Sequence, residues 1–134
     1  MSSPDPLGSR VRALFSDLAH AGEPAGAAAE RILRGEAGRE SEGTRVHFTL
    51  CLGDGRVLEA RYRAYGCPHT LATCEWLARS LEGRPAAALR PGAVGGLGGP
   101  LDWAQRLEIP PAKLGRLLTI EDALRNALSG LTIA

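Results

Sequence analysis

Aromatic side chains are scarce in this chain: they make up 4% of its 134 residues, whereas hydrophobic residues as a whole make up 44%. A chain of this length is expected to fold as one domain, and its core must be built mainly from leucine, alanine and valine. No apolar run approaches the roughly 20 residues needed to cross a bilayer, so no membrane contact is expected. The opening residues are polar and proline-rich and lack the pattern of a secretory signal peptide.

An excess of charge and an abundance of cysteine are also lacking. Sixteen basic and fifteen acidic side chains leave a net charge of +1, and the arginines are scattered, so a nucleic-acid partner is not expected. The three cysteines, Cys51, Cys67 and Cys74, are an odd number without the spacing of a disulfide scaffold. We therefore expect reduced thiols and a cytoplasmic location.

The clearest structural pattern is an antiparallel hairpin. Apolar residues alternate with polar ones over residues 46–52, which predicts a strand with one buried face. The sequence Gly53-Asp54-Gly55 predicts a tight turn, because Asp-Gly readily adopts positive φ. The return strand is expected over residues 57–64, and its apolar face consists of Leu58, Ala60, Tyr62 and Ala64.

Helices are expected on both sides of this hairpin. Apolar spacing predicts helices over residues 11–18 and 70–82, a short helical or irregular segment over 101–107, and a last helix that Thr119 caps and Gly130 ends. The composition of residues 25–34 favours a further helix, and residues 35–43 read as a polar loop. Residues 1–10 are expected to form a flexible lead-in to one domain over 11–134, with a glycine-rich insertion at about 91–100. The predicted fold class is α+β, a small antiparallel sheet with helices packed on it.

A cysteine stands where the return strand runs into the following helix. Gly66 ends the strand pattern, and Pro68 suits the first turn of a helix, where its missing N–H costs nothing. Cys67 then lies at a helix N-terminus, whose partial positive charge favours a thiolate over a thiol. Such a thiolate suits metal binding, sulfur transfer or nucleophilic attack.

Two stretches of the chain resemble the NifU/IscU-type iron–sulfur cluster assembly scaffolds. The first is Ala60-Arg61-Tyr62-Arg63-Ala64-Tyr65-Gly66-Cys67, with a helix closed by Leu81-Glu82-Gly83-Arg84. The second is Ile109-Pro110-Pro111-Ala112-Lys113-Leu114, followed by Ile120-Glu121-Asp122-Ala123-Leu124, which is similar to the family's Pro-Pro motif and closing helix. The resemblance implies the family's α+β scaffold fold and a role in iron–sulfur cluster assembly.

The resemblance also implies a ligand set that this chain only partly retains. In the family, three cysteines and an aspartate converge on the cluster, and thiolates are the ligands that iron in a cluster prefers. Cys67 matches the second cysteine. A Cys-Gly-Asp motif is replaced here by Glu42-Gly43-Thr44, and a His-Cys pair is replaced by Gly115-Arg116.

The chain offers limited replacements for the missing ligands. Cys74 lies two turns along the helix from Cys67, about 10 Å away, and reads as a small buried hydrophobe. Cys51 reads as an incidental strand residue. His69 is a candidate nitrogen ligand or proton carrier, although a histidine in the first turn of a helix is more often simply solvated. His47 and His20 are expected at the surface.

Several arrangements of the altered site stay open. Glu42 and Arg116 would form an ion pair in place of the cluster, and Arg116 beside Cys67 would lower the pKa of its thiol. The rival arrangement is a single zinc or iron ion held by Cys67, Glu42 and His69. A dimer that brings two Cys67 side chains together is a third.

The motif of Ile109, Pro110, Pro111, Ala112 and Lys113 predicts a partner. In the family this loop is recognised by an Hsp70-type chaperone, and an extended Pro-Pro segment suits capture of a short peptide. The alternative is a rigid loop that only starts the last helix. The resemblance also implies a cysteine desulfurase as a partner.

We therefore expect an iron–sulfur cluster assembly protein, not an enzyme, that receives iron and sulfur and passes on a cluster. The alternative is a metal-free accessory or regulatory module of the same system, which accepts persulfide sulfur on Cys67. A thiol-dependent enzyme that uses Cys67 with His69 is the weakest reading, because the pattern supplies no third orienting group.

Overall fold

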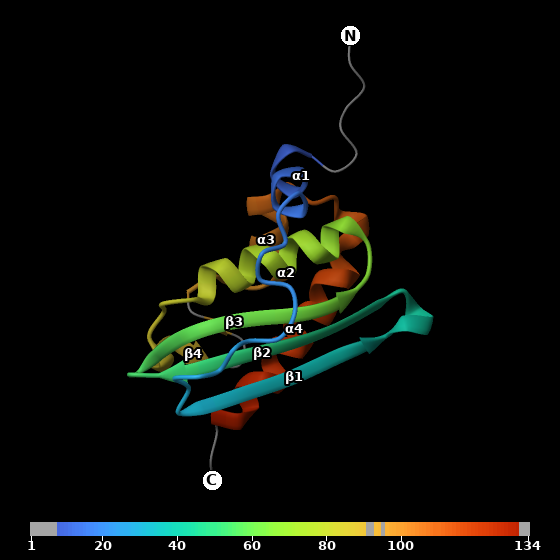
Figure 1. Cartoon of the computed structure of the whole chain (residues 1–134). Helices are drawn as coiled ribbons and strands as arrows, with labels where there is room; N and C mark the ends of the chain where they lie inside the picture. Colours follow the sequence, from blue (N-terminus) through green and yellow to red (C-terminus); the bar gives the residue numbers. More distant parts are fainter. Residues whose placement is uncertain (1–7, 91–92, 95, 132–134) are drawn as a thin grey trace.

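The chain folds as a three-stranded antiparallel sheet covered on one face by helices (Figure 1), and this confirms the predicted α+β class. A computed structural model describes residues 8–90, 93–94 and 96–131. Its helices and strands are, in order, α1 (Ser9–Phe15), β1 (Arg31–Arg39), β2 (Thr44–Gly53), β3 (Arg56–Tyr65), α2 (Pro68–Leu81), β4 (Leu89–Arg90), β5 (Ala93–Val94), α3 (Pro100–Leu107) and α4 (Leu114–Leu128). No helix in the described ranges is long and apolar enough to span a bilayer.

The predicted hairpin is confirmed as β2 and β3. Asp54 and Gly55 both have positive φ, 54° and 71°, which gives the turn the right-handed twist of the strands. A bulge shifts the register after Cys51, which pairs with Glu59, while Leu52 pairs with Val57. The core face of β3 therefore carries Val57 in place of the predicted Leu58, since the extra residue reverses the alternation.

The first strand of the sheet was not predicted. Residues 25–34 were expected to be helical and 35–43 to be a loop, but β1 runs through both and pairs with β2 along its whole length. Helix propensity is a weak preference that pairing and burial override. The core face of β1 is formed by Leu33, which is 4% exposed, and by Gly35. The loop at the end of β1 is a short 3₁₀ helix, Glu40–Glu42.

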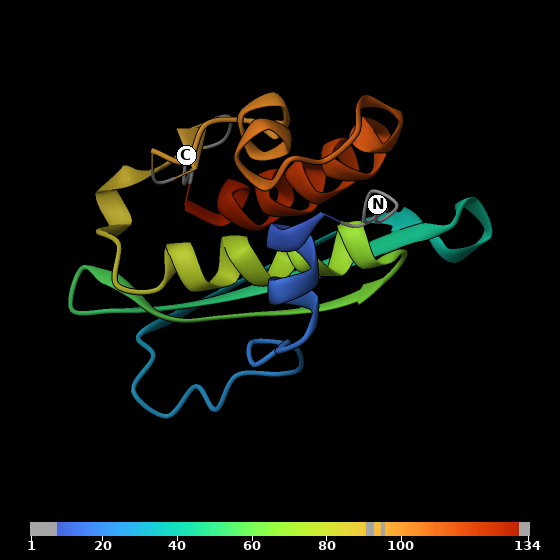
Figure 2. The ribbon, with the colours of Figure 1, turned by 90° about the horizontal axis from the view of Figure 1, so that it is seen from above.

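Two helices, α2 and α4, cover one face of the sheet, with α3 packed outside them (Figure 2). α2 confirms the predicted helix after Cys67, and its stripe of Cys74, Leu77, Ala78 and Leu81 is fully buried. α4 begins at Leu114, earlier than the predicted cap at Thr119. The Thr119 hydroxyl instead donates within the helix to the Gly115 carbonyl at 3.3 Å, because the 3₁₀ turn Pro111–Lys113 already starts the helix.

The segment between α1 and β1 lies on the opposite face of the sheet (Figure 2). It follows the edge of β3, where the Gly22 N–H donates to the Tyr62 carbonyl at 2.7 Å. Cys51 is 1% exposed, so β2 is buried on both faces near the hairpin. α1 is shorter than predicted: it starts at Ser9, within the expected lead-in, and ends at Phe15.

The glycine-rich stretch falls partly outside the described residues, as do residues 1–7 of the lead-in. In its described part, β4 and β5 pair with each other, and Val94 and Leu97 are buried. A 3₁₀ helix, Ala86–Ala88, precedes β4, and the predicted segment over 101–107 is confirmed as α3.

Candidate functional site

The candidate site lies where β3 ends and α2 begins, as the sequence predicts. Cys67 is the extended residue before the first turn of α2, and Pro68 opens the helix. A Cβ on Gly66 would lie 3.0 Å from the Thr70 side chain. Glycine at position 66 thus lets the strand end come close to the residue that contacts the thiol.

The Cys67 sulfur is half-buried and held by its own helix. Its Sγ lies 3.6 Å from the Thr70 hydroxyl and 4.0 Å from His69 Nδ1. Burial alone would raise the pKa of the Cys67 thiol, but hydrogen bonds from Thr70 and the His69 backbone, together with the positive charge of Arg116, outweigh it. The pKa of Cys67 is therefore lowered, and the predicted thiolate is supported.

His69 is buried, so the expectation of a solvated histidine is wrong. It is 5% exposed, and Lys113 and Arg116, at the start of α4, lie near enough for their charges to act on it. Burial, and then the charges of Lys113 and Arg116, lower the pKa of His69, which keeps the ring neutral near pH 7. Its Nε2 is buried without a hydrogen-bond partner in the described structure.

Arg116 reaches this site from α4. Its charge acts on both Cys67 and His69, which confirms the predicted influence on the thiol. The expected Glu42–Arg116 ion pair is not formed by the described residues: Glu42 is exposed in the 3₁₀ helix after β1, and the buried Nε of Arg116 has no partner. Position 44 is a buried threonine of β2, and Gly115 has open space around it.

The candidate ligands are not gathered into a metal site. Across residues 8–90, 93–94 and 96–131, no three histidine, cysteine, aspartate or glutamate side chains are placed to hold one ion. Cys67, Glu42 and His69 therefore do not form the predicted mixed set. An iron–sulfur cluster usually takes four ligands, mostly thiolates, and one chain offers a single thiolate here.

The other two cysteines are structural, as expected. Both are free thiols and buried. Burial first, and then the negative charge of Glu75, raise the pKa of the Cys74 thiol well above its ordinary value. Burial, followed by the charge of Glu59, also raises the pKa of Cys51.

The Pro-Pro motif forms the exposed link between α3 and α4. Ile109 is 6% exposed and anchors it, whereas Pro110, Pro111 and Ala112 face solvent. Pro110 has polyproline-like angles, φ −62° and ψ 146°. Lys113 follows at the end nearest His69. Its use as a binding loop stays a prediction.

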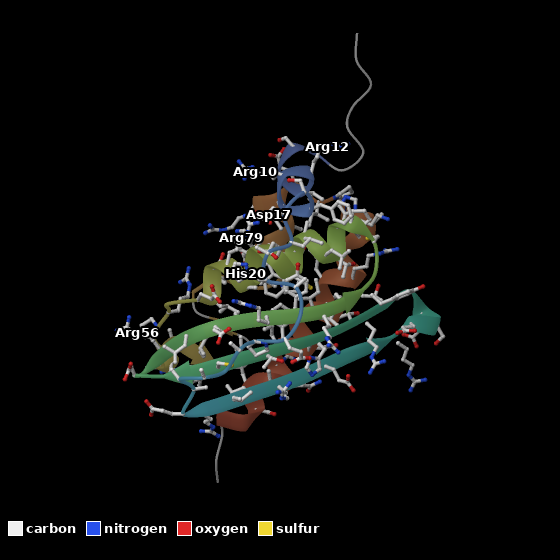
Figure 3. All side chains as sticks on the ribbon, in the orientation of Figure 1. Arg10, Arg12, Asp17, His20, Arg56 and Arg79 are labelled. Atoms are coloured by element: carbon white, nitrogen blue, oxygen red, sulfur yellow. The ribbon has the colours of Figure 1, made fainter. Side chains whose placement is uncertain are left out.

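A buried charged network was missed by the sequence analysis. His20, expected at the surface, lies between two carboxylates of α2 and its C-terminus. Its Nδ1 is 2.6 Å from Glu75 Oε2, and its Nε2 is 2.9 Å from Glu82 Oε1. Glu75 is fully buried and also accepts hydrogen bonds from the Tyr62 hydroxyl and from Arg79. Figure 3 labels two members of this network, His20 and Arg79. The available signal was Glu75 beside Cys74, a charged residue within the apolar stripe of a helix.

The chain is similar in sequence to one known protein and in fold to several solved structures. No protein-family model matches it. It is 38% identical over 129 residues to the bifunctional protein NifU/MnmA of Rubrobacter xylanophilus, and this covers 92% of the chain. The chain spans 24% of that relative's length.

Two solved structures share the fold. A scaffold protein for iron–sulfur cluster assembly of the SUF system, from Fervidobacterium islandicum, has a TM-score of 0.64 at 12% identity and covers 92% of this chain and 96% of its own. The N-terminal part of a nitrogen-fixing NifU-like protein from Brucella abortus has a TM-score of 0.64 at 15% identity, with coverages of 93% and 94%. These likenesses confirm the predicted scaffold fold.

Proposed function

We propose that this chain, a relative of the NifU/IscU-type iron–sulfur cluster assembly scaffolds in sequence and in fold, works in iron–sulfur cluster assembly. Within that system we assign it the handling of sulfur on Cys67, without catalytic turnover of its own. The observation that carries the proposal is a half-buried cysteine with a lowered pKa at the start of α2, in positively charged surroundings.

The proposed step is the transfer of sulfane sulfur from a cysteine desulfurase. The Cys67 thiolate attacks the outer sulfur of the partner's persulfide, R–S–S⁻, and the S–S bond breaks. The partner's thiolate leaves with the electron pair and takes up a proton, and Cys67 becomes a persulfide. A thiolate is the nucleophile that this exchange needs, and Arg116 favours it over the thiol.

Binding of a whole cluster by one chain is not part of the proposal. Three of the four family ligand positions carry Glu42, Thr44 and Arg116, and none of these is a thiolate. A guanidinium beside the remaining cysteine also disfavours a metal cation, since like charges repel at short range. The iron and the cluster are therefore treated as cargo of the wider system.

The test is persulfide transfer from a desulfurase. The chain is incubated anaerobically with a cysteine desulfurase and free cysteine, and the peptide that contains Cys67 is fragmented in a mass spectrometer. We expect one added sulfur on Cys67, lost in Cys67→Ser and kept in the matched variant Cys74→Ala. Sulfur on Cys74, or none on either residue, would refute the proposal.

We also propose that the exposed loop at Pro110, Pro111 and Ala112 binds an Hsp70-type chaperone. The support is its exposure and its two prolines, which restrict the backbone at the polyproline-like Pro110 and the 3₁₀ turn Pro111–Lys113 and so lower the entropy cost of capture. The chain should stimulate the ATPase of such a chaperone, and Pro110→Ala with Pro111→Ala should remove the effect. Equal stimulation by both proteins would contradict this role.

The free thiols fit a reducing compartment, and we infer the cytoplasm.

A further inference from the structure

The surroundings of Cys67 carry more positive charge than the thiolate balances. Arg116 and Lys113 both lie close enough to act on His69, and neither forms an ion pair within the described part of the chain. The charged groups that shift the pKa values of Cys67 and His69 most are Arg116 and Lys113, and both are cations. Two cations therefore face a single thiolate.

The arginines in the hollow on the outer face of the sheet are compensated by glutamates. The hollow on the outer face of the sheet is lined by Arg34, Arg45 and Arg63, and each is within 3.3 Å of a glutamate. That hollow therefore offers no surplus charge, despite its size. The surroundings of Cys67 differ from that hollow, because Arg116 and Lys113 are the charged groups that act on His69 there.

Two buried nitrogen atoms at the site also lack partners. His69 is 95% buried, its ring lies against Cys67, and its Nε2 makes no hydrogen bond to the described residues. The Nε of Arg116 is likewise buried and unpartnered. Unpaired buried polar groups are costly, so a ligand that supplies acceptor oxygens would relieve them. Excess positive charge and unused donors both favour an oxyanion.

Resting on the proposed acceptance of sulfur by Cys67, we propose that this site takes sulfane sulfur from a small anionic donor of the thiosulfonate class. Thiosulfate is the simplest member. Arg116 binds the sulfonate group, Lys113 adds long-range attraction, and Cys67 receives the outer sulfur. A sulfonate matches a guanidinium because its oxygens accept two parallel N–H bonds.

The step is balanced without any further reactant. The Cys67 thiolate attacks the outer sulfur of thiosulfate, and a new S–S bond forms. The bond from the outer sulfur to the sulfonate sulfur breaks, and sulfite leaves with the electron pair. The cysteine sulfur is oxidised to the level of a persulfide, the sulfonate sulfur is reduced, and the total charge is unchanged.

The experiment measures persulfide on Cys67 and released sulfite after anaerobic incubation of the full chain with thiosulfate. Arg116→Gln is compared with Arg125→Gln, a matched change on the same helix at an exposed position outside the site. For each variant, the rate of sulfur transfer from thiosulfate to Cys67 is divided by the rate at which iodoacetamide alkylates Cys67. Iodoacetamide is neutral, so its rate reports only the reactivity of the thiolate. We expect this ratio to fall about tenfold or more in Arg116→Gln, as for a lost charge-assisted hydrogen bond, and to stay unchanged in Arg125→Gln.

The outcomes separate this inference from the proposed function. Sulfur transfer from the desulfurase but not from thiosulfate would overturn the inference and leave the proposed function standing. Transfer from thiosulfate with the same ratio in both arginine variants would overturn the role of Arg116. Transfer from neither donor would overturn both. As a binding readout, sulfate should slow iodoacetamide alkylation of Cys67 in the unaltered chain and not in Arg116→Gln, and equal slowing would count against the oxyanion site.

Discussion

The lowered pKa of Cys67 depends on residues that reach it from two helices. Thr70 and His69 belong to α2 itself, and Arg116 belongs to α4. We predict that Thr70→Val slows alkylation of Cys67 by iodoacetamide at pH 7, because a hydrogen bond to the thiolate is lost, and such a bond is worth about 1.5 kcal/mol. Thr70→Ser keeps the hydroxyl and should react like the unaltered chain. Equal rates in all three proteins would show that Thr70 does not support the thiolate.

Glu75 holds the segment after α1 onto α2. It is fully buried and accepts hydrogen bonds from His20, Tyr62 and Arg79. We predict that Glu75→Gln lowers the free energy of unfolding at pH 7 by about 2 kcal/mol, since an amide has one acceptor oxygen in place of two and leaves a buried hydrogen-bond donor unpaired. Urea denaturation measures this loss. A cost below about 1 kcal/mol, typical of exposed pairs, would contradict the network.

Glu75 and Glu82, the two carboxylates that contact His20, make the stability of the fold depend on pH. Burial alone would raise the pKa values of Glu75 and Glu82, but their hydrogen bonds, from Arg79 to Glu75 and from the Ala60 N–H to Glu82, outweigh it and lower both. Their contribution is therefore complete above the unfolded-state pKa, about 4.3, and is lost as the pH falls through the lower folded-state values. Unfolding free energies measured from pH 6 down to 3 should fall more steeply in the unaltered chain than in Glu75→Gln. Parallel curves would contradict this assignment.

Sequence reasoning succeeded for single residues where the determinants are local. The position of Cys67 follows from Gly66 and Pro68 beside it, and the burial of Cys74 follows from helical spacing. His69 and Arg116 depend on how α4 packs beside α2, and no local pattern encodes that distance. The same holds for His20, whose partners lie more than fifty residues along the chain.

At the scale of elements, the contact between β1 and α4 determines how closely the helix covers the sheet. A Cβ on Gly35 would lie 2.2 Å from the backbone N of Ala127 and 2.3 Å from the carbonyl O of Ala123. We predict that Gly35→Ala destabilises the fold by about 1–3 kcal/mol or more, because the helix must move outward. The matched control is Gly115→Ala on α4, where nothing lies within 4 Å, and it should stabilise by about 0.5–1 kcal/mol. Urea unfolding with the same effect for both substitutions would contradict this packing.

The elements differ in how far the sequence determines them. The β2–β3 hairpin was predictable because Asp54-Gly55 fixes its turn and the alternation fixes its faces. β1 escaped prediction because its core face uses Gly35 between Leu33 and Ala37, which weakens the apolar alternation. The start of α4 was misplaced because Thr119 resembles a cap, although Pro111 begins the helical turn.

Across the whole molecule, the residues that hold the fold together are different from those at the altered positions of the site. The sheet and its helices are held by buried residues such as Phe48, Leu77 and Leu124, whereas Glu42 and Gly115 are exposed. Changes at these exposed positions therefore leave the core intact. This explains how a scaffold fold persists with one cysteine at its site.

The most direct test is the iron content after anaerobic incubation with ferrous iron and sulfide, followed by desalting. We predict iron well below a stoichiometric cluster and no visible absorbance that depends on Cys67. As a control for the procedure, Glu42→Cys, Thr44→Asp and Arg116→Cys together restore the family's ligand types and should raise the bound iron. A stoichiometric cluster in the unaltered chain, lost in Cys67→Ser, would contradict the claim that this site handles sulfur without holding a cluster.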